Sequence, residues 1–212
     1  MGRTREARKP LDRERIERNA LALIDRTGVN DFSLRTLAKE LKVEPMSLYH
    51  WYPSKAHLLD ALVDRVVGSM QAPRAGSFEK RITAAAHSFR TEACAHPGFT
   101  PYLVLHRFNT RRALGVLEDL LAVFHEAGMD AETAAASFRL LVHWMMGFCL
   151  DETAGFAKGP SAVDPPSAEV VEREFPHVAA LAPFNKPEHF DALFDAGLKR
   201  ILVALDRPER AA

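Results

Sequence analysis

The chain has 212 residues, enough for one medium-sized domain or for a small domain joined to a larger one. Apolar residues make up 47% and charged residues 26%, which is typical of a globular protein and excludes a disordered chain. The 28 basic and 28 acidic side chains cancel overall, but residues 1–72 carry 13 basic and 10 acidic residues, and residues 73–212 carry 15 and 18. This mildly basic front part indicates that a polyanionic partner would bind there.

Two cysteines, Cys94 and Cys149, exclude a disulfide-rich secreted scaffold and a multi-cysteine zinc site. Both are expected to be reduced core thiols. Residues 1–10 are charged and precede no apolar stretch, so no signal peptide is expected. The most apolar stretch, residues 140–150, is shorter than a membrane span. We therefore expect a soluble, cytoplasmic protein with no membrane partner.

Apolar residues recur with helical spacing along nearly the whole chain, which predicts an all-α fold. Residues 1–10 are expected to form a basic arm. Residues 71–77, which contain Pro73 and Gly76, are the best linker candidate, and predict an N-terminal domain over 11–70 and a C-terminal domain over 74–208. The expected helices are Pro10 to Gly28, Ser33 to Leu41, Pro45 to Tyr52, Lys55 to Met70, Phe78 to Ala95, Pro101 to His106, Arg111 to Ala127, a helix capped by Asp130 and running to Thr153, Ser167 to Ala182 with a break at Pro176, and Pro187 to Leu205.

Two short helices in the N-terminal part, within residues 33–52, are joined by a tight turn and have the spacing of a helix-turn-helix. In that motif the first helix braces the second, and the outer face of the second enters the major groove of DNA. The pattern alone is equally typical of a structural helical hairpin.

The segment FSLRTLAKELKVEPMSLYHWYPSKAHLLDAL, residues 32–62, closely resembles the DNA-binding domain of the TetR (tetracycline repressor) family. The resemblance covers about residues 11–66. It is carried by Leu-Arg-x-Leu-Ala at 34–38, Val-x-x-x-Ser-Leu-Tyr at 43–49, and Ser-Lys at 54–55 before Leu-Leu-Asp-Ala-Leu. Lys42 stands where the family usually has a turn glycine, so this residue is expected to tolerate an unfavourable backbone conformation.

The resemblance implies a three-helix DNA-binding domain and a set of side chains that meet double-stranded DNA. Arg35 would approach a base edge or a phosphate, Lys55 would clamp a phosphate at a helix N-terminus, and Met46 would press on a thymine methyl group. Trp51 and Tyr52 are expected to be core aromatic residues. The whole expected contact set is Arg35, Thr36, Pro45, Met46, Ser47, Tyr49, His50 and Lys55.

Residues 78–206 resemble the tetracycline-repressor-type C-terminal domain through Gly-Met-Asp at 128–130, His143, Gly147 and the last stretch of the chain. The resemblance implies a larger all-helical domain for effector binding and dimerisation. The residues agree, because the segment 140–150 is apolar nearly all round and the last helix carries two apolar stripes. Two copies of these two helices would form a four-helix interface in a homodimer. The alternative is one buried core helix in a monomer.

Apolar and aromatic residues with few polar groups predict a small-ligand cavity among the middle helices, although a plain core has the same composition. His143 is the best single candidate, because a histidine among aromatic residues needs a hydrogen-bond partner. Asp151 resembles a family position used for a magnesium–drug chelate, but the expected earlier histidine aligns with Val104 and leaves His106 out of register, so no metal site is expected. The candidate ligand-binding residues are His87, Leu103, Arg107, Phe108, Leu117, Phe138, Leu141, His143, Trp144, Met145 and Phe148.

The chain contains no phosphate-binding loop, dinucleotide glycine pattern, nucleophile elbow or His-Glu-x-x-His motif, so we expect neither an enzyme nor a bound cofactor. The sequence predicts a transcriptional regulator, most simply a repressor that leaves an inverted-repeat operator when a small lipophilic effector binds. The alternative from another class is a DNA-binding or structural protein that senses no effector.

Overall fold

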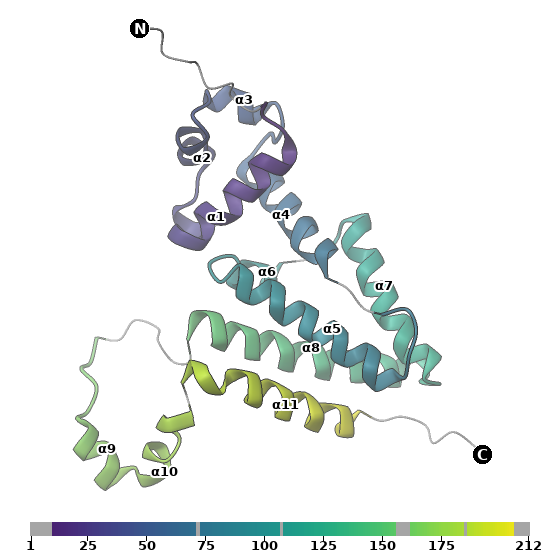
Figure 1. The fold of residues 1–212 in the computed structure, drawn as a ribbon, viewed down its shortest axis with the longest axis vertical. Helices are drawn as coiled ribbons and strands as arrows, with labels where there is room; N and C mark the ends of the chain where they lie inside the picture. The colour runs from purple at the N-terminus through teal and green to yellow at the C-terminus, as the bar shows by residue number, and fades with distance from the viewer. Residues whose placement is uncertain (1–9, 71–72, 107, 156–161, 185, 206–212) are drawn as a thin grey trace, which may run out of the picture.

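The computed structural model describes residues 10–70, 73–106, 108–155, 162–184 and 186–205, and Figure 1 shows their arrangement. These residues form helices joined by short turns, without a strand among them, as the sequence predicts. The α-helices are α1 (Arg13–Asp31), α2 (Leu34–Leu41), α3 (Pro45–Tyr49), α4 (Lys55–Ser69), α5 (Phe78–Ala95), α6 (Thr100–Leu105), α7 (Arg111–Glu126), α8 (Ala131–Ala154), α9 (Ala168–Glu174), α10 (Pro176–Ala179) and α11 (Phe190–Ala204), with 3₁₀ turns at Ala182–Phe184 and Pro187–His189.

Helices α1 to α3 and the first half of α4 form an N-terminal domain, drawn in purple and blue in Figure 1. Its interior is apolar and closed: Ile16, Leu37, Leu48 and Leu58 come from all four helices, and none of them is exposed to solvent. Helix α4 continues downwards from this domain into the larger C-terminal domain (Figure 1). One helix therefore belongs to the packing of both domains.

Side-chain caps explain where several of the helices begin. The Ser33 hydroxyl accepts a hydrogen bond from the backbone N–H of Thr36, and the Thr36 hydroxyl in turn accepts one from the Ser33 N–H. Asp130 caps α8 by accepting the Thr133 N–H at 2.8 Å, and this bond holds the pKa of the Asp130 carboxyl below its usual value. Both caps were predicted from the sequence.

Three predicted helix ends differ from the structure by less than a turn. The first helix was expected to stop at Gly28, where φ is 77°, but it extends three residues further, to Asp31. The second short helix ends at Tyr49 rather than Tyr52. The proline at 187 opens a 3₁₀ turn, and the α-helix starts three residues later at Phe190.

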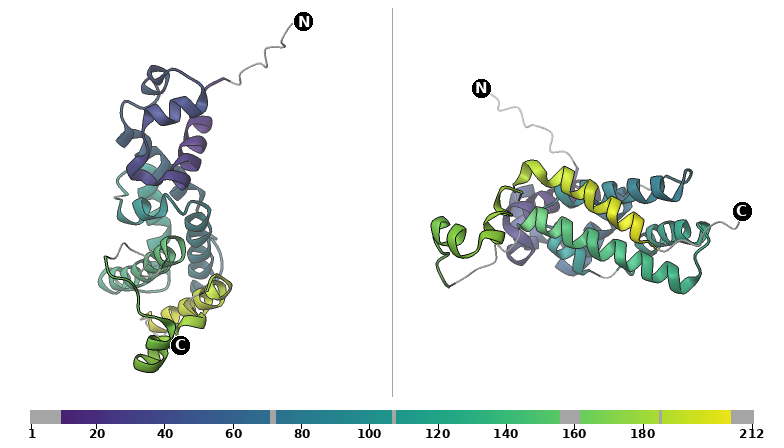
Figure 2. Two further views of the ribbon diagram at one scale, coloured as in Figure 1. Left: turned by 90° about the vertical axis from the view of Figure 1, so that its left-hand side faces the viewer. Right: turned by 90° about the horizontal axis from the view of Figure 1, so that it is seen from below.

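The C-terminal domain is built around α8, which packs against α5, α6, α7 and α11. In Figure 2, α8 and α11 lie side by side when the molecule is seen from below. Between them, the rings of Trp144 and Phe148 pack on Phe194 with centroids 5.2 Å apart in each case. Helix α8 is long and apolar enough to cross a membrane by length and composition alone, but it packs against four other helices of the bundle and leaves one face exposed.

An ion-paired arginine fixes three helices of this domain to one another. The Arg90 guanidinium on α5 donates two hydrogen bonds to Glu152 on α8, at 2.7 and 2.6 Å, and one to Asp191 on α11, at 2.7 Å. These carboxylates raise the pKa of Arg90, and its side chain lies 5.0 Å above the Phe194 ring. The positive charge of Arg90 at the junction of α5, α8 and α11 is thus paired with two carboxylates.

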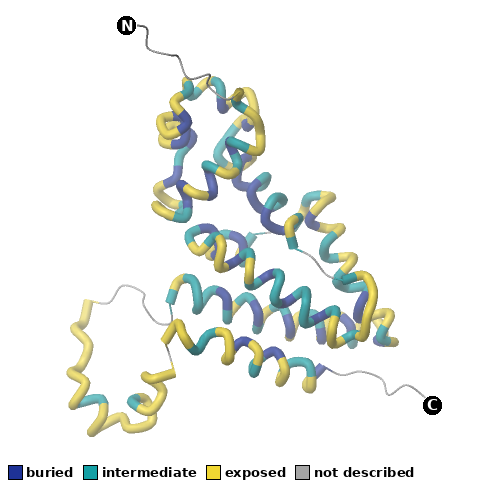
Figure 3. The backbone as a smooth tube through the Cα atoms, in the orientation of Figure 1, coloured by how far each residue is buried: buried dark blue, intermediate teal, exposed yellow. Residues whose placement is uncertain are grey.

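Helices α9 and α10 form an arm that packs mainly on itself and extends from the bundle (Figure 3). Four of its large apolar side chains are about half exposed or more: Phe175, Val178, Leu181 and Phe184. The bundle carries a second exposed apolar set on α8 and α11, namely Leu140, Leu193 and Val203. The C-terminal domain thus exposes apolar side chains both on the arm and on α8 and α11.

Candidate DNA-binding and effector-binding sites

Helices α2 and α3 form the predicted helix-turn-helix, and the turn between them depends on Lys42. Its backbone is left-handed, with φ 56° and ψ 44°, which confirms the expectation drawn from the missing glycine. The Val43 N–H donates to the Ala38 carbonyl at 3.0 Å and closes the turn. Leu48 of α3 is fully buried against the domain, so the opposite face of α3 is turned outwards.

The side chains of the expected DNA-contacting residues differ in solvent exposure and in the hydrogen bonds that they already make. Arg35, Met46, Tyr49 and His50 are exposed, and Met46 reaches 64% exposure. Pro45 and Ser47 are half-buried at the start of α3. The exposed Thr36 uses its hydroxyl in the cap with Ser33. The outward face of α3 therefore presents a thioether, a phenol and an imidazole, and no side-chain amide or guanidinium.

Lys55 has an intramolecular role that the sequence did not reveal. Its ammonium donates to the Val29 carbonyl at 2.6 Å and lies 5.8 Å from the Phe32 ring. It thereby joins the end of α1 to the start of α4. An ammonium has three donors, so this bond leaves capacity for a phosphate oxygen.

The two aromatic residues that follow α3 behave differently. Tyr52 is buried, as expected, and donates to Glu17 at 2.6 Å. Burial and this carboxylate raise the pKa of Tyr52. Trp51 is 37% exposed, so the prediction that it is a core residue is wrong. Its backbone N–H donates to the Leu48 carbonyl at 2.9 Å and closes the turn that follows α3.

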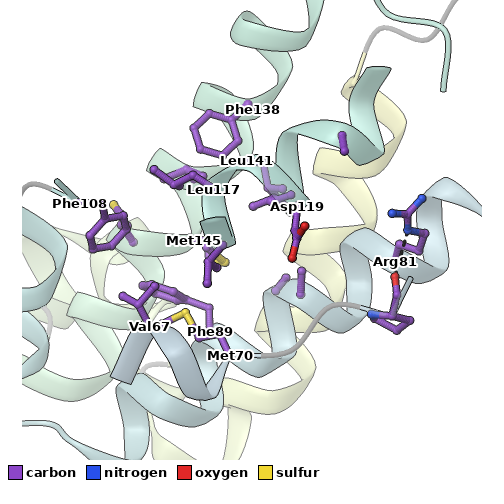
Figure 4. A pocket seen from close by; sticks show the side chains of 18 of the residues that line it. Val67, Met70, Arg81, Phe89, Phe108, Leu117, Asp119, Phe138, Leu141 and Met145 are labelled. Carbon is purple, nitrogen blue, oxygen red and sulfur yellow. Dashed lines mark hydrogen bonds between the residues drawn. The ribbon is translucent and has the colours of Figure 1, made fainter. Parts of the chain in front are cut away.

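A cavity of about 440 Å³ lies in the C-terminal domain between the end of α4 and helices α5, α7 and α8 (Figure 4). Its wall is mainly apolar, with charged groups on the part formed by the linker, α5 and α7. It is lined by Val67, Met70, Pro73, Arg74, Arg81, Ala85, Ala86, Phe89, Phe108, Val116, Leu117, Asp119, Leu120, Ala122, Glu126, Phe138, Leu141, Val142, Met145 and Met146.

Five of the residues proposed from sequence line this cavity together: Phe108, Leu117, Phe138, Leu141 and Met145. Three of these follow one another along α8 at helical spacing, and Figure 4 shows Phe138, Leu141 and Met145 around the same space. The face of α8 that carries these three residues is therefore the cavity wall.

The other proposed ligand residues lie elsewhere. His143 is exposed, not enclosed by aromatic side chains, because it points away from the cavity-lining face of α8. Trp144 and Phe148 pack on α11, and Leu103 is buried in α6. His87 pairs with Asp195 on α11 at 3.1 Å. Arg107 lies outside the described residues.

The polar part of the cavity wall was not predicted from the sequence. Arg81 has only 11% of its side chain exposed, donates to the Pro73 carbonyl at 3.0 Å, and forms an ion pair with Glu126. Met70 and Pro73 contribute from the end of α4 and the linker. The one available signal was the spacing of Arg81, Ala85 and Phe89, which places them on one face of α5.

The described residues hold no group of three histidine, cysteine, aspartate or glutamate side chains close enough to bind a metal ion. Asp151 has one buried carboxylate oxygen that accepts no hydrogen bond from any described residue. His106 pairs with Asp60 at 3.0 Å. Cys149 is buried, which raises the pKa of its thiol to about 12, whereas Cys94 is exposed and is not the core thiol that was expected.

Two family models match this chain, and they cover the two domains in turn. Residues 16–62 match "Bacterial regulatory proteins, tetR family", and residues 71–207 match "Tetracyclin repressor-like, C-terminal domain". The domain limits predicted from the sequence, 11–70 and 74–208, stay predictions.

Similar proteins span nearly the whole chain. The class G tetracycline repressor protein of Vibrio anguillarum is 24% identical over 208 residues, which are 93% of this chain and 94% of the relative. A possible TetR family regulator from Streptomyces coelicolor A3(2) has a structure with a TM-score of 0.72 and 26% identity, over 92% of this chain and 98% of that one. The S. coelicolor TetR family protein ActR, solved with actinorhodin, has a TM-score of 0.70 and 25% identity, over 93% and 97%.

The family is one of transcriptional regulators and not of enzymes. Its members are soluble proteins that bind DNA and small-molecule ligands as dimers. The helix-turn-helix of α2 and α3, the cavity in the helical bundle and both family models agree, and this chain belongs to the TetR family of ligand-responsive transcriptional regulators.

Proposed function

We propose that this chain is a cytoplasmic repressor, that its homodimer binds an inverted-repeat operator, and that a small lipophilic molecule in the cavity releases it. The observation that carries the proposal is the position of α4. This 15-residue helix begins at Lys55, in the expected DNA-contact set, and its last turn contributes Val67 to the cavity wall. A rigid helix of about 22 Å therefore connects the two sites.

The side chains on the outward face of α3 support the proposal that two copies of the chain bind one operator. The exposed side chains on α3 are few, and Met46, Tyr49 and His50 offer little direct reading of purine edges. A useful ratio of specific to non-specific affinity then requires two half-sites read by a dimer. Of the expected contacts, Met46 would meet a base and Arg35 a base edge or a phosphate, whereas Ser47, Tyr49, His50 and Lys55 would contact the DNA backbone.

The exposed apolar residues on α8 and α11 support a homodimer through these two helices. Leu140 is 43% exposed, Leu193 41% and Val203 82%. A second copy of both helices would cover these side chains in a four-helix arrangement.

The cavity wall limits the class of effector. Its volume of about 440 Å³ is within the range of small-molecule sites. Arg81 is already paired with Glu126, and the other arginine of the wall, Arg74, is exposed to solvent, so an anionic ligand would gain little from either charge. We expect a neutral or cationic lipophilic molecule with one or two hydrogen-bond acceptors, because an unpaired buried charge is costly.

The test has two steps, both with full-length protein. Operator sequences are first selected from a randomised duplex library, and an inverted repeat is expected. Compounds that raise the melting temperature are then added to the protein–operator complex in a mobility-shift assay. Release by such compounds supports the proposal, whereas compounds that bind without changing operator affinity would favour the protein that senses no effector.

A further inference from the structure

Two histidine–aspartate pairs cross the boundary between the N-terminal and C-terminal domains. Nδ1 of His96, at the end of α5, lies 3.0 Å from Oδ2 of Asp25 on α1. Nε2 of His106, at the end of α6, lies 3.0 Å from Oδ1 of Asp60 on α4. Helix α6 lies between the two histidines in the chain, so both of its ends are tied to the N-terminal domain (Figure 1).

A tightly packed turn holds the His96–Asp25 pair in place. The Gly98 N–H donates to the other oxygen of Asp25 at 3.1 Å. A Cβ atom on Gly98 would lie 2.5 Å from the Ile24 carbonyl oxygen and 2.6 Å from the Asp25 Cα, so only glycine permits this approach. The buried Thr100 hydroxyl fixes the same turn, because its one proton is shared between the Ala93 and His96 carbonyls, at 2.9 and 3.0 Å.

The surroundings of both histidines contain other ionisable groups. His96 lines a polar cleft of about 560 Å³ together with Arg13, Glu17, Asp64, Arg65, Glu92 and Arg112, from α1, α4, α5 and α7. The three arginines and three carboxylates in that set balance one another. His106 stacks on Tyr102, with ring centroids 4.9 Å apart, and faces Asp60 as its carboxylate. In both places the nearest charged partner of the histidine is an aspartate of the N-terminal domain.

We propose that the His96–Asp25 and His106–Asp60 pairs form a proton-sensitive joint that positions the N-terminal domain on the C-terminal domain. Histidine changes its charge between pH 5 and 8, and an imidazolium–carboxylate hydrogen bond is stronger than a neutral one. Protonation therefore tightens the joint as the pH falls. If the chain is the proposed repressor, this joint sets how readily its DNA-contacting helices move. Only this regulatory role rests on the proposed function.

A third pair of the same chemistry provides a matched control. His87 and Asp195 lie 3.1 Å apart, but they join α5 to α11 inside the C-terminal domain. The variant Asp195→Asn removes one histidine–carboxylate attraction without touching the boundary. The double variant Asp25→Asn, Asp60→Asn removes both attractions across the boundary and keeps side chains of the same shape, with an oxygen that can still accept the Gly98 N–H.

Hydrogen exchange measured on the full-length protein at pH 6 and pH 8 tests the proposal without DNA or effector. After allowance for the intrinsic pH dependence of exchange, the amides of residues 98–105, which lie between the two histidines, should exchange about threefold to tenfold more slowly at pH 6 in the parent protein, the size expected for partly exposed pairs. The double variant should lose this difference, and Asp195→Asn should keep it. His50 and His57 are present in all these proteins, so their titration cannot account for a loss.

Retention of the full difference in the double variant would overturn the proposal. If the double variant fails to fold, Asp60→Asn alone is measured, because Asp60 is 48% exposed and its carboxylate is tolerant of change; it should lose part of the difference. An unchanged difference in that variant would equally count against the joint. Because no DNA or effector is used, these results are independent of the repressor proposal.

Discussion

In the N-terminal domain, short helices close around side chains such as Leu37, Leu48 and Leu58 that have no exposed surface. In the C-terminal domain, longer helices leave a cavity of about 440 Å³ between them, and the residues on its wall are mostly half-buried. The first domain therefore derives its shape from complete local packing, whereas the second keeps unfilled space. A small molecule can supply contacts in the second domain that the chain itself does not make.

The largest expected effect follows from this difference in packing. Leu48→Ala should lower the free energy of unfolding by about 2–5 kcal/mol, since it empties a closed core. Leu117→Ala should cost clearly less, because Leu117 already faces the cavity. Urea denaturation of both variants provides the measurement. Equal losses would show that the cavity wall is packed as tightly as the N-terminal core.

Filling the cavity should affect the effector response alone. Phe138→Trp adds volume to the wall, and a steric cost of about 1–3 kcal/mol against the bound compound corresponds to roughly fivefold to 150-fold weaker binding. Operator binding without compound should stay near that of the parent protein, as measured by mobility shift. Trp144→Ala is the control, because Trp144 packs on α11 outside the cavity. It should reduce stability but keep the compound's affinity, and the reverse pattern would place the effector elsewhere.

Within the N-terminal domain, mutations can distinguish a residue that recognises a base from a residue that contacts the DNA backbone. Met46→Ala should relax the preference at one base pair by about 1–3 kcal/mol if the thioether packs on a thymine methyl group. Lys55→Ala should weaken all sequences alike and lower the salt dependence, because a phosphate contact carries no base information. A selection profile from randomised operators measures the first effect. An unchanged profile for Met46→Ala would show that α3 is rotated differently on DNA.

The smallest expected effect is a gain of stability at the turn between α2 and α3. Lys42→Gly should raise the free energy of unfolding by about 1 kcal/mol, because glycine adopts the left-handed conformation without the Cβ penalty. Lys39→Gly, in the exposed interior of α2, should instead destabilise the protein by about 0.5–1 kcal/mol. Thermal unfolding of the two variants compares them directly, and a loss at both positions would contradict the strain at Lys42.

Local signals in the sequence were sufficient for most helix limits and for the helix-turn-helix. Ser33 and Asp130 identify helix starts through bonds to their own first turns, and Lys42 identifies a strained turn by its place in the motif. Each of these interactions involves residues within three or four positions of one another. Such interactions can be recognised without knowledge of the tertiary structure.

The cavity could be predicted only in part, because α8 is apolar on nearly every side. Periodicity therefore did not distinguish the face of Met145, which lines the cavity, from the face of Trp144, which packs on α11. Arg81 was missed since a single arginine on a helix is normally solvated; its burial depends on Glu126, which is 45 residues away in sequence. His143 was wrongly assigned to the cavity for the same reason as Trp144, because the apolar pattern of α8 does not show which face lines the cavity.

Three methionines, Met70, Met145 and Met146, form part of the cavity wall. Methionine is unbranched and polarizable, and it changes rotamer at small energetic cost. A wall of this kind adapts its outline to its occupant, so related molecules of different shape can be accommodated with similar contact. Selectivity among them then depends on the less adaptable aromatic rings of Phe89, Phe108 and Phe138, whose positions in the wall restrict the outline to a greater degree.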